Sequence, residues 1–266
     1  MKVSKIVKHF FERGSDWMLS QTDGIIAGDP EKDVDRCLVT WMPSFKALRY
    51  MVEHNFELLI CHEALFWTGE HIIDETDPDI AVKAAYIRDN NLTVVRIHDG
   101  WDSWPEIGIP WAWAKFLGID SAPVAMVKGG VCQQRYDIEP IAVGELVKSM
   151  AKRCAAVGEP MLQFAGDKSQ VVSKIGINTG GIGDIDRFIQ MGCDCSVTID
   201  EFARTTGGGG CNKILKAKDI NHPVICVDHG TAEEPGMVTL TQYINDSIEG
   251  LAAEHLPHGS TFRLIG

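Results

Sequence analysis

Three short apolar segments of this chain each end at or next to a histidine that has a carboxylate close by. These histidines are His62, His98 and His229. Imidazole nitrogen is a good ligand for Zn, Fe, Ni or Co, and added carboxylates admit a harder ion such as Mn, or two ions that share a carboxylate. The residue types therefore predict that the protein binds divalent metal, with Zn, Fe or Mn as the expected ions.

Two of the histidines have a carboxylate at the same spacing. Asp102 lies four residues after His98, and Glu233 lies four residues after His229. If the chain is helical at these places, both side chains of a pair point from one face of the helix. Each pair then offers one nitrogen and one oxygen ligand to the same ion.

Hydrolysis is the reaction that such a site favours. A bound divalent ion lowers the pKa of a water molecule toward ~7 and polarises a carbonyl or a ring C=N bond. Glu63 directly follows His62, so it is a candidate ligand and also the candidate general base. Other carboxylates beside the ligands can orient histidines, although a solvated loop position is the preferred interpretation of them. They are Asp99, Asp228 and Glu234.

Alternating strands and helices must position these residues. Short apolar runs predict strands at 37–41, 56–61 and 92–97, and helices are expected to begin after Ser44 and at Pro78. This alternation is typical of a parallel sheet covered by helices. Ligands gather outside the carboxyl ends of strands in open parallel sheets, so we expect the three histidine segments to converge on one crevice.

The remainder of the chain predicts a second α/β block. Helices are expected at 141–157, 184–191 and 239–253, and strands at 161–164, 171–177, 196–199 and 223–227. The fold class is therefore α/β, with two packed domains whose parallel or mixed sheets are covered by helices. We expect a metal-site domain made of residues 1–127 and 220–266, and a second domain made of residues 128–219.

Composition excludes several classes of partner. Hydrophobic residues make up 45% of the 266 residues and charged residues 23%, which is typical of a folded globular chain. The formal net charge of −12 makes nucleic acid and anionic membranes poor partners. Charged residues interrupt the N-terminal segment, and no apolar run approaches the ~18 residues of a membrane span. We expect a cytoplasmic protein whose eight cysteines, which include no CxxC pair, are reduced and mostly buried.

The histidine segments also carry a family resemblance. Residues 58–67, the His98 to Asp102 pair and the His229 to Glu233 pair resemble, in the same order, the three metal motifs of the NIF3-like family. Residues 174–183, which end in a glycine-rich turn, resemble the start of that family's later half. Some members of the family are known as type 2 GTP cyclohydrolase I.

The resemblance implies two facing α/β domains with a dinuclear metal centre in the cleft, and a homohexamer as the assembly. Its implied ligands are His62, His98, Asp102, His229 and Glu233, with Asp102 or Glu233 as the bridging residue. One position departs from the family pattern. Two adjacent histidines are common where this chain has His62 and Glu63. Glu63 can be a metal ligand, in which case one of the two sites prefers a harder ion. Alternatively, Glu63 acts as general base and the protein binds one metal ion fewer.

The leading hypothesis is a metal-dependent hydrolase that uses activated water on a small cyclic or nucleotide-like substrate, at a C–N bond. A metal-binding adaptor or metal-delivery protein would use the same ligands without turnover. A metal-free α/β binding protein is the third hypothesis, and it predicts that no metal accompanies the purified protein.

Overall fold

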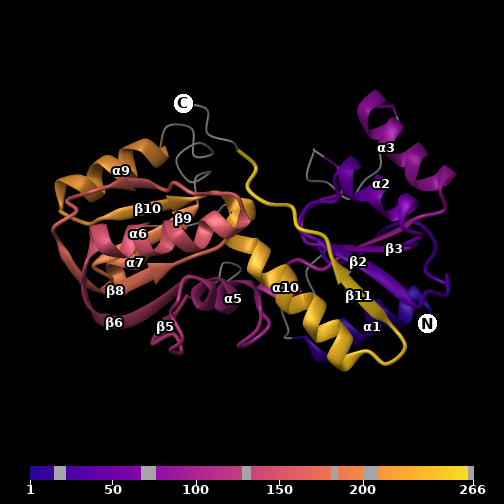
Figure 1. The fold of residues 1–266 in the computed structure, drawn as a ribbon, viewed down its shortest axis with the longest axis horizontal. Helices are drawn as coiled ribbons and strands as arrows, with labels where there is room; N and C mark the ends of the chain where they lie inside the picture. The colour runs from indigo at the N-terminus through magenta and orange to yellow at the C-terminus, as the bar shows by residue number, and fades with distance from the viewer. Residues whose placement is uncertain (15–21, 67–75, 128–132, 181–184, 200–208, 263–266) are drawn as a thin grey trace. The chain divides into compact units, whose positions relative to one another are not determined.

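The computed structural model describes residues 1–14, 22–66, 76–127, 133–180, 185–199 and 209–262, without the side chains of 209–211. The chain divides into two compact units (Figure 1). The first unit contains Met1–Gly108 and Met237–His258, and the second contains Ile109–Gly236 and Gly259–Gly266. Among the described residues, no helix has the length and apolar character that crossing a membrane requires.

A five-stranded mixed sheet forms the centre of the first unit. Its strand order is β1-β4-β3-β2-β11. The strands are β1 (Gly24–Ala27), β2 (Arg36–Thr40), β3 (Leu58–Cys61), β4 (Thr93–Arg96) and β11 (Ala252–His255). All neighbours pair in parallel except the edge strand β1, which pairs antiparallel with β4. Every residue of β3 and β4 is buried, as expected for strands covered on both faces.

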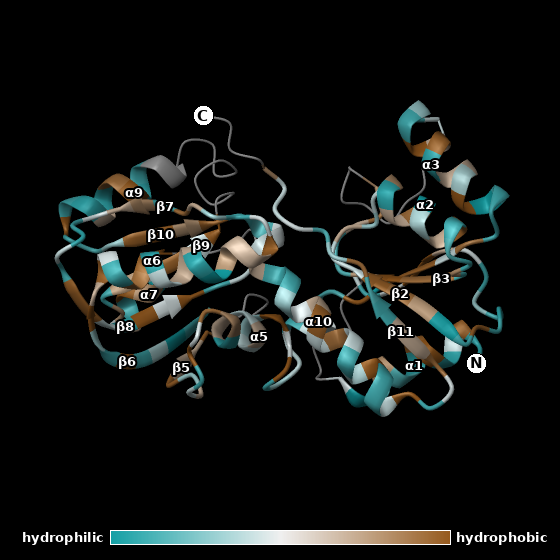
Figure 2. Cartoon of the chain, viewed as in Figure 1, coloured by the Kyte–Doolittle hydropathy of each residue, from teal (hydrophilic) through white to brown (hydrophobic). Residues whose placement is uncertain are grey.

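Helices cover both faces of this sheet (Figure 1). They are α1 (Val3–Arg13), α2 (Phe45–Glu53), α3 (Pro78–Asp89), the single turn α4 (Asp99–Asp102) and the later part of α10 (His229–Ser247). Ser44 caps α2 by accepting a hydrogen bond from the backbone N–H of Ala47 at 3.3 Å. Apolar side chains of α2 and α3 pack on the sheet in one core, and Figure 2 shows the hydrophobic colours of β2 and β3 beneath these helices.

A six-stranded mixed sheet forms the second unit, in the order β5-β6-β8-β9-β10-β7. The strands are β5 (Ala125–Met126), β6 (Gln134–Ala142), β7 (Gln163–Ala165), β8 (Val171–Ile177), β9 (Cys195–Ile199) and β10 (Val224–Val227). The three central strands β8, β9 and β10 are parallel. The main core lies between the sheet and the helices α5 (Ile109–Phe116), α6 (Val143–Cys154) and the start of α10. A smaller core lies under α7 (Ile185–Gln190) and α9 (Gly209–Asp219), and a short 3₁₀ turn, η2 (Ala155–Val157), follows α6.

The structure confirms the expected α/β class and most predicted strands, but several boundaries differ. The predicted helix 239–253 is wrong at both ends, because α10 begins at His229 and residues 252–253 lie on β11. The predicted helix 141–157 loses its first two residues to β6 and its last turn to η2. The expected division places residues 109–127, 220–236 and 259–266 in the metal-site domain, whereas these residues belong to the second unit.

The described cysteines fit the expectation of reduced thiols. Six cysteines are free and buried. Burial raises the pKa of the Cys37 and Cys61 thiols to about 12, which leaves them unreactive at neutral pH. Cys132 and the side chain of Cys211 lie outside the described residues.

Candidate metal centre

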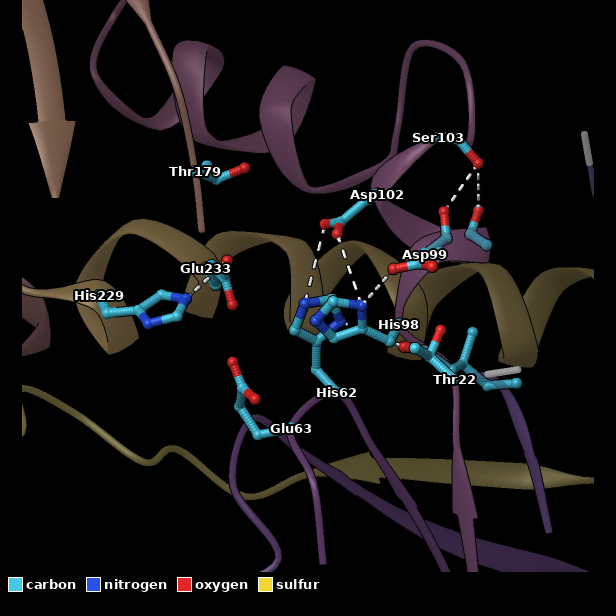
Figure 3. Close-up of polar contacts among 12 residues, drawn as sticks. Thr22, His62, Glu63, His98, Asp99, Asp102, Ser103, Thr179, His229 and Glu233 are labelled. Carbon is cyan, nitrogen blue, oxygen red and sulfur yellow. Dashed lines mark hydrogen bonds and ion pairs between the residues drawn. The ribbon is translucent and has the colours of Figure 1, made fainter. Parts of the chain in front are cut away.

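The register of the first sheet brings two of the predicted metal motifs together. β3 and β4 are parallel neighbours, and Cys61 pairs with Arg96. The residues that follow each strand therefore leave the sheet at the same edge. Figure 3 shows the side chains of His62 and His98 lying together at this edge. Their rings are stacked, with centroids 4.3 Å apart and an interplanar angle of 18°.

His62 is completely buried and held in one orientation. The backbone N–H groups of His62 and Glu63 both donate to the carbonyl of Trp41, at 3.1 and 3.0 Å. The His62 Nδ1 lies 3.2 Å from the carbonyl oxygen of Ile97. A carbonyl can only accept, so Nδ1 carries the proton of the neutral ring, and the lone pair that can bind a metal is on Nε2. That nitrogen lies 3.7 Å from Asp102 Oδ1.

His98 stands at the start of α4 and is surrounded by carboxylates. Its Nδ1 lies 2.6 Å from Asp99 Oδ1 and 3.9 Å from Asp102 Oδ2. Asp23, distant in the sequence, accepts hydrogen bonds from the backbone N–H groups of His98 and Gly100. Asp23 thus holds the turn in place. The predicted helical geometry between His98 and Asp102 is confirmed in part, because α4 spans Asp99–Asp102 and His98 is its N-cap, outside the helical turn.

The electrostatics around His98 favour a cation. Burial opposes the charged imidazolium, but the hydrogen bond with Asp99 and the charge of Asp102 outweigh it and raise the pKa of His98 to about 9. Burial also raises the pKa of Asp23, against the hydrogen bonds that it accepts from the α4 backbone. A site that stabilises a proton this strongly can stabilise a metal cation in its place.

Glu63 faces a buried arginine as well as the histidines. Arg96 Nη2 lies 3.7 Å from Glu63 Oε2, and Arg96 Nε donates to the His62 carbonyl at 2.8 Å. The Arg96 side chain is only 7% exposed, so its charge balances that of Glu63 in a largely dry environment. Glu63 stands where a histidine is common in the family pattern, and the buried Arg96 guanidinium provides its counter-charge.

Two groups of possible ligand atoms in the first unit are compact enough for a metal. One contains His62, Glu63 and His98, and the other contains His98, Asp99 and Asp102. Within each group the ligand atoms lie within 4.8 Å of one another. This mixture of imidazole and carboxylate donors suits a divalent Zn, Fe or Mn ion. Asp99, predicted as a loop carboxylate, instead bonds the imidazole of a proposed ligand.

The third motif lies at the start of α10, in the second unit. His229 Nε2 lies 3.0 Å from Glu233 Oε1, one helical turn away (Figure 3). Glu233 is 1% exposed. The expected helical geometry is again confirmed, and the pair presents one nitrogen and one oxygen donor. β10, which precedes His229, belongs to the second sheet. The pairing of β3 with β4 that brings His62 next to His98 therefore does not determine the position of His229.

The other carboxylates of this motif bond to the backbone. Asp228 is the N-cap of α10, because its Oδ1 accepts from the N–H of Thr231 at 3.3 Å, and its Oδ2 accepts from the N–H of Thr261 at 3.1 Å. Glu234 accepts from the N–H of Gly259 at 3.2 Å. These contacts support a structural role for both side chains.

Sequence reasoning missed two residues of the first unit. Arg96 interrupts an apolar strand, and a charged residue in a fully buried strand was a usable signal for a buried ion pair. Asp23 offered no such signal, because it lies 75 residues before the N–H group that it binds. The glycine turn at 181–183 lies outside the described residues. Phe66, Trp101 and Trp113 are buried, and Trp67 lies outside the described residues.

Curated relatives match most of the chain at low identity. A protein of Clostridium perfringens named GTP cyclohydrolase 1 type 2 homolog is 22% identical over 238 residues, which are 85% of this chain and 84% of the relative. A protein of Chlamydia muridarum with the same name is 24% identical over 252 residues, 88% of this chain and 90% of the relative.

Solved structures share the fold over nearly the whole chain. The structure titled protein ybgI, unknown function, has a TM-score of 0.77 and 18% identity, covering 98% of this chain and 100% of its own. A hypothetical protein of Staphylococcus aureus has a TM-score of 0.76 and 16% identity, covering 100% and 99%. Reduced HcgD from Methanocaldococcus jannaschii has a TM-score of 0.74 and 16% identity, covering 96% and 98%. The model of the Duf34/NIF3 (NGG1p interacting factor 3) family matches residues 1–257, and the chain belongs to that family.

Proposed function

We propose that this protein is a metal-dependent hydrolase that acts on a C–N bond of a small cyclic or nucleotide-like substrate. The observation that carries the proposal is the cluster at the end of β3 and β4. Two stacked imidazoles and three carboxylates there offer ligand atoms within 4.8 Å of one another in two overlapping groups. The charge of protonated His98 and of Arg96 balances part of this acidic group, and a bound divalent ion would take the place of the His98 proton.

The residues of the first unit fit a divalent ion on their donor chemistry. His62 presents Nε2, because its Nδ1 bonds the Ile97 carbonyl. His98 and Asp102 supply a second imidazole and a carboxylate. We propose Zn, Fe or Mn as the ion. When bound, it would supply Lewis-acid polarisation and an activated water at neutral pH.

His229 and Glu233 are proposed as further metal ligands, which makes two ions per protomer. Their support is the helical spacing and the 3.0 Å that separates His229 Nε2 from Glu233 Oε1. Two donors are fewer than the three or four that a stable protein site needs. The pair therefore requires additional ligands.

The chain's own residues have separate tasks in the proposed reaction. Asp99 bonds His98 Nδ1 at 2.6 Å and fixes the orientation of that ring. Glu63 accepts the proton of the attacking water, and Arg96 at 3.7 Å holds the Glu63 carboxylate in place. Buried walls around His62 keep bulk water away from the reacting bond.

The names of the curated relatives give the reaction class independent support. Both are called GTP cyclohydrolase 1 type 2 homolog, a name that describes opening of a ring by water. The low identity carries no particular substrate over to this chain. We propose a small-molecule substrate, no nucleic-acid or membrane partner, and a homohexamer. The free, buried cysteines support a reducing location such as the cytoplasm.

The test is hydrolysis by metal-loaded protein of a panel of cyclic amides, lactones and nucleotides, followed by mass spectrometry. We expect turnover that disappears on chelation and returns with added Zn, Fe or Mn. Glu63→Gln should lower the rate by ~10²-fold or more, whereas Glu249→Gln, at an exposed position, should not. Stoichiometric metal that exchanges readily without turnover of any panel member would contradict the hydrolase and favour metal delivery.

A further inference from the structure

A cavity of about 480 Å³ lies inside the first unit, beside the metal-ligand cluster. Its volume is within the range of small-molecule sites, roughly 300–1,000 Å³. Most of its wall is apolar or aromatic, contributed by Met42, Phe45, Ala64, Leu65 and Phe66. Glu63 belongs both to this wall and to a group of possible metal ligands. The cavity therefore opens next to the residues proposed to carry out the reaction.

Lys83 on α3 lines the same cavity, and it is an unusual residue for such a position. It is 3% exposed, and its Nζ donates a hydrogen bond to the carbonyl of Leu65. Lysine is among the residue types that are least often buried to this extent. Burial lowers the pKa of Lys83 to about 8, so the amine still carries its proton in most molecules at pH 7.

The charges around the cavity favour an anionic ligand. The charged side chains among the described residues of the wall are Lys83 and Glu63. Arg96 is not part of the wall, but its Nη2 lies 3.7 Å from Glu63 Oε2 and balances the charge of that carboxylate. An acid that enters this cavity meets an ammonium group in a low-dielectric wall, where a charge-assisted hydrogen bond is strong. The aromatic side chains Phe45 and Phe66 suit the flat face of a ring.

We propose that this cavity binds a small aromatic or heteroaromatic carboxylate, with Lys83 recognising the carboxylate and the apolar wall holding the ring. Binding itself needs no metal. The identification of this ligand as the substrate rests on the proposed function, because Glu63 connects the cavity to the metal-ligand cluster. The substrate class is then a cyclic amide or related heterocycle that carries a carboxylate on a planar ring.

The experiment measures binding of 2-naphthoate and of its neutral isostere 2-naphthamide to the full-length protein, by ligand fluorescence and ligand-observed NMR. We expect 2-naphthoate to bind wild-type protein at least about tenfold more tightly than 2-naphthamide. Lys83→Met should remove this preference and leave 2-naphthamide unchanged, because methionine keeps the apolar stem. Lys46→Met, at an exposed position close to the cavity wall in sequence, is the matched control and should bind both probes as wild type does.

Ala64→Trp is the second variant, because it places a bulky side chain in the cavity and keeps Lys83 in the sequence. It should abolish binding of both probes, and thermal unfolding of each variant verifies that it folds. Equal affinity of wild type for the two probes, or a 2-naphthoate affinity that survives Lys83→Met or Ala64→Trp, would overturn the proposal. Binding is measured with and without chelator, so the two proposals can fail separately. A protein that binds 2-naphthoate but holds no metal would refute the proposed hydrolase function and leave the proposed binding site standing.

Discussion

Each imidazole of the first unit has its own orienting partner. His62 is fixed by the carbonyl of Ile97, a neutral acceptor, whereas His98 is fixed by the carboxylate of Asp99. The two rings therefore differ in electrostatics although they are stacked at 4.3 Å. A carboxylate behind a ligating histidine makes the ring more basic and a stronger donor to metal. His98 is for this reason the residue on which metal affinity should depend most.

Asp99→Asn should lower the pKa of His98 in metal-free protein by about one unit or more. The wild-type pKa of about 9 lies above the ordinary 6.5, so the stabilisation that it provides is complete below pH 6.5 and is lost as the pH rises through 9. That loss is on the order of 3 kcal/mol in wild type. Asp99→Asn should reduce this pH-dependent loss of stability. NMR titration of the histidine and denaturation at several pH values measure both effects, and an unshifted His98 would refute the role of Asp99.

Arg96→Met should destabilise the protein by about 1–3 kcal/mol, because it leaves the Glu63 carboxylate without its buried counter-charge and removes the bond to the His62 carbonyl. Arg88→Met, on the exposed side of α3, is the control and should stay within about 0.5 kcal/mol of wild type. Urea denaturation measures both variants. A stability of Arg96→Met equal to wild type would show that the pair contributes nothing.

At the scale of elements, the sequence predicted what periodicity and apolar runs determine. β2, β3 and β4 are short apolar runs between helices, and all three were found where expected. The edge strand β11 was missed because its sequence, Ala-Ala-Glu-His, favours helix rather than strand. Only parallel pairing with β2 makes it a strand, and that pairing joins residues more than 200 positions apart. The sequence of residues 252–255 alone cannot predict such a long-range pairing.

The ends of α10 show the same limit. Pro235 lies inside this helix, where an interior proline costs ~3 kcal/mol, and the predicted start at residue 239 lies after it. Tertiary packing outweighs that cost, since Ala232, Met237 and Leu240 of the helix are fully buried. The position of the helix start also affects the candidate metal ligands. Because α10 begins at His229, the pair His229 and Glu233 has helical geometry.

Asp228→Ala should lower the free energy of unfolding by about 1–2 kcal/mol, because it removes the cap of α10 and the bond to the Thr261 N–H. Its metal content should equal that of wild type. Asp246→Ala, an exposed aspartate near the other end of the same helix, is the control and should change stability by less than about 0.5 kcal/mol. Loss of metal at unchanged stability would instead make Asp228 a ligand.

At the scale of the whole molecule, the two units are interleaved in the sequence. The chain passes from one unit to the other after Gly108, Gly236 and His258. Apolar patterning identified two α/β blocks, but the expected division placed β10 in the metal-site domain, because an apolar strand is equally suited to either sheet. Its parallel pairing with β9 places it in the second. Ligand types and spacings were readable from the sequence, whereas the partners that orient them were not.

For the proposed homohexamer, the mass in solution should be six times the 29.3 kDa protomer mass. Light scattering after size-exclusion chromatography measures it, at both low and moderate salt, because a net charge of −12 opposes association most at low salt. A monomer at micromolar concentration in both buffers would contradict the predicted assembly.

The most direct test of the central claim is the metal content of the purified protein, measured by elemental analysis after dialysis. We expect two divalent ions per protomer in wild type, and fewer in both His98→Ala and His229→Ala. His54→Ala, at an exposed position, is the control and should keep the wild-type content. Wild-type protein without stoichiometric metal, or both site variants with the full wild-type content, would contradict the account.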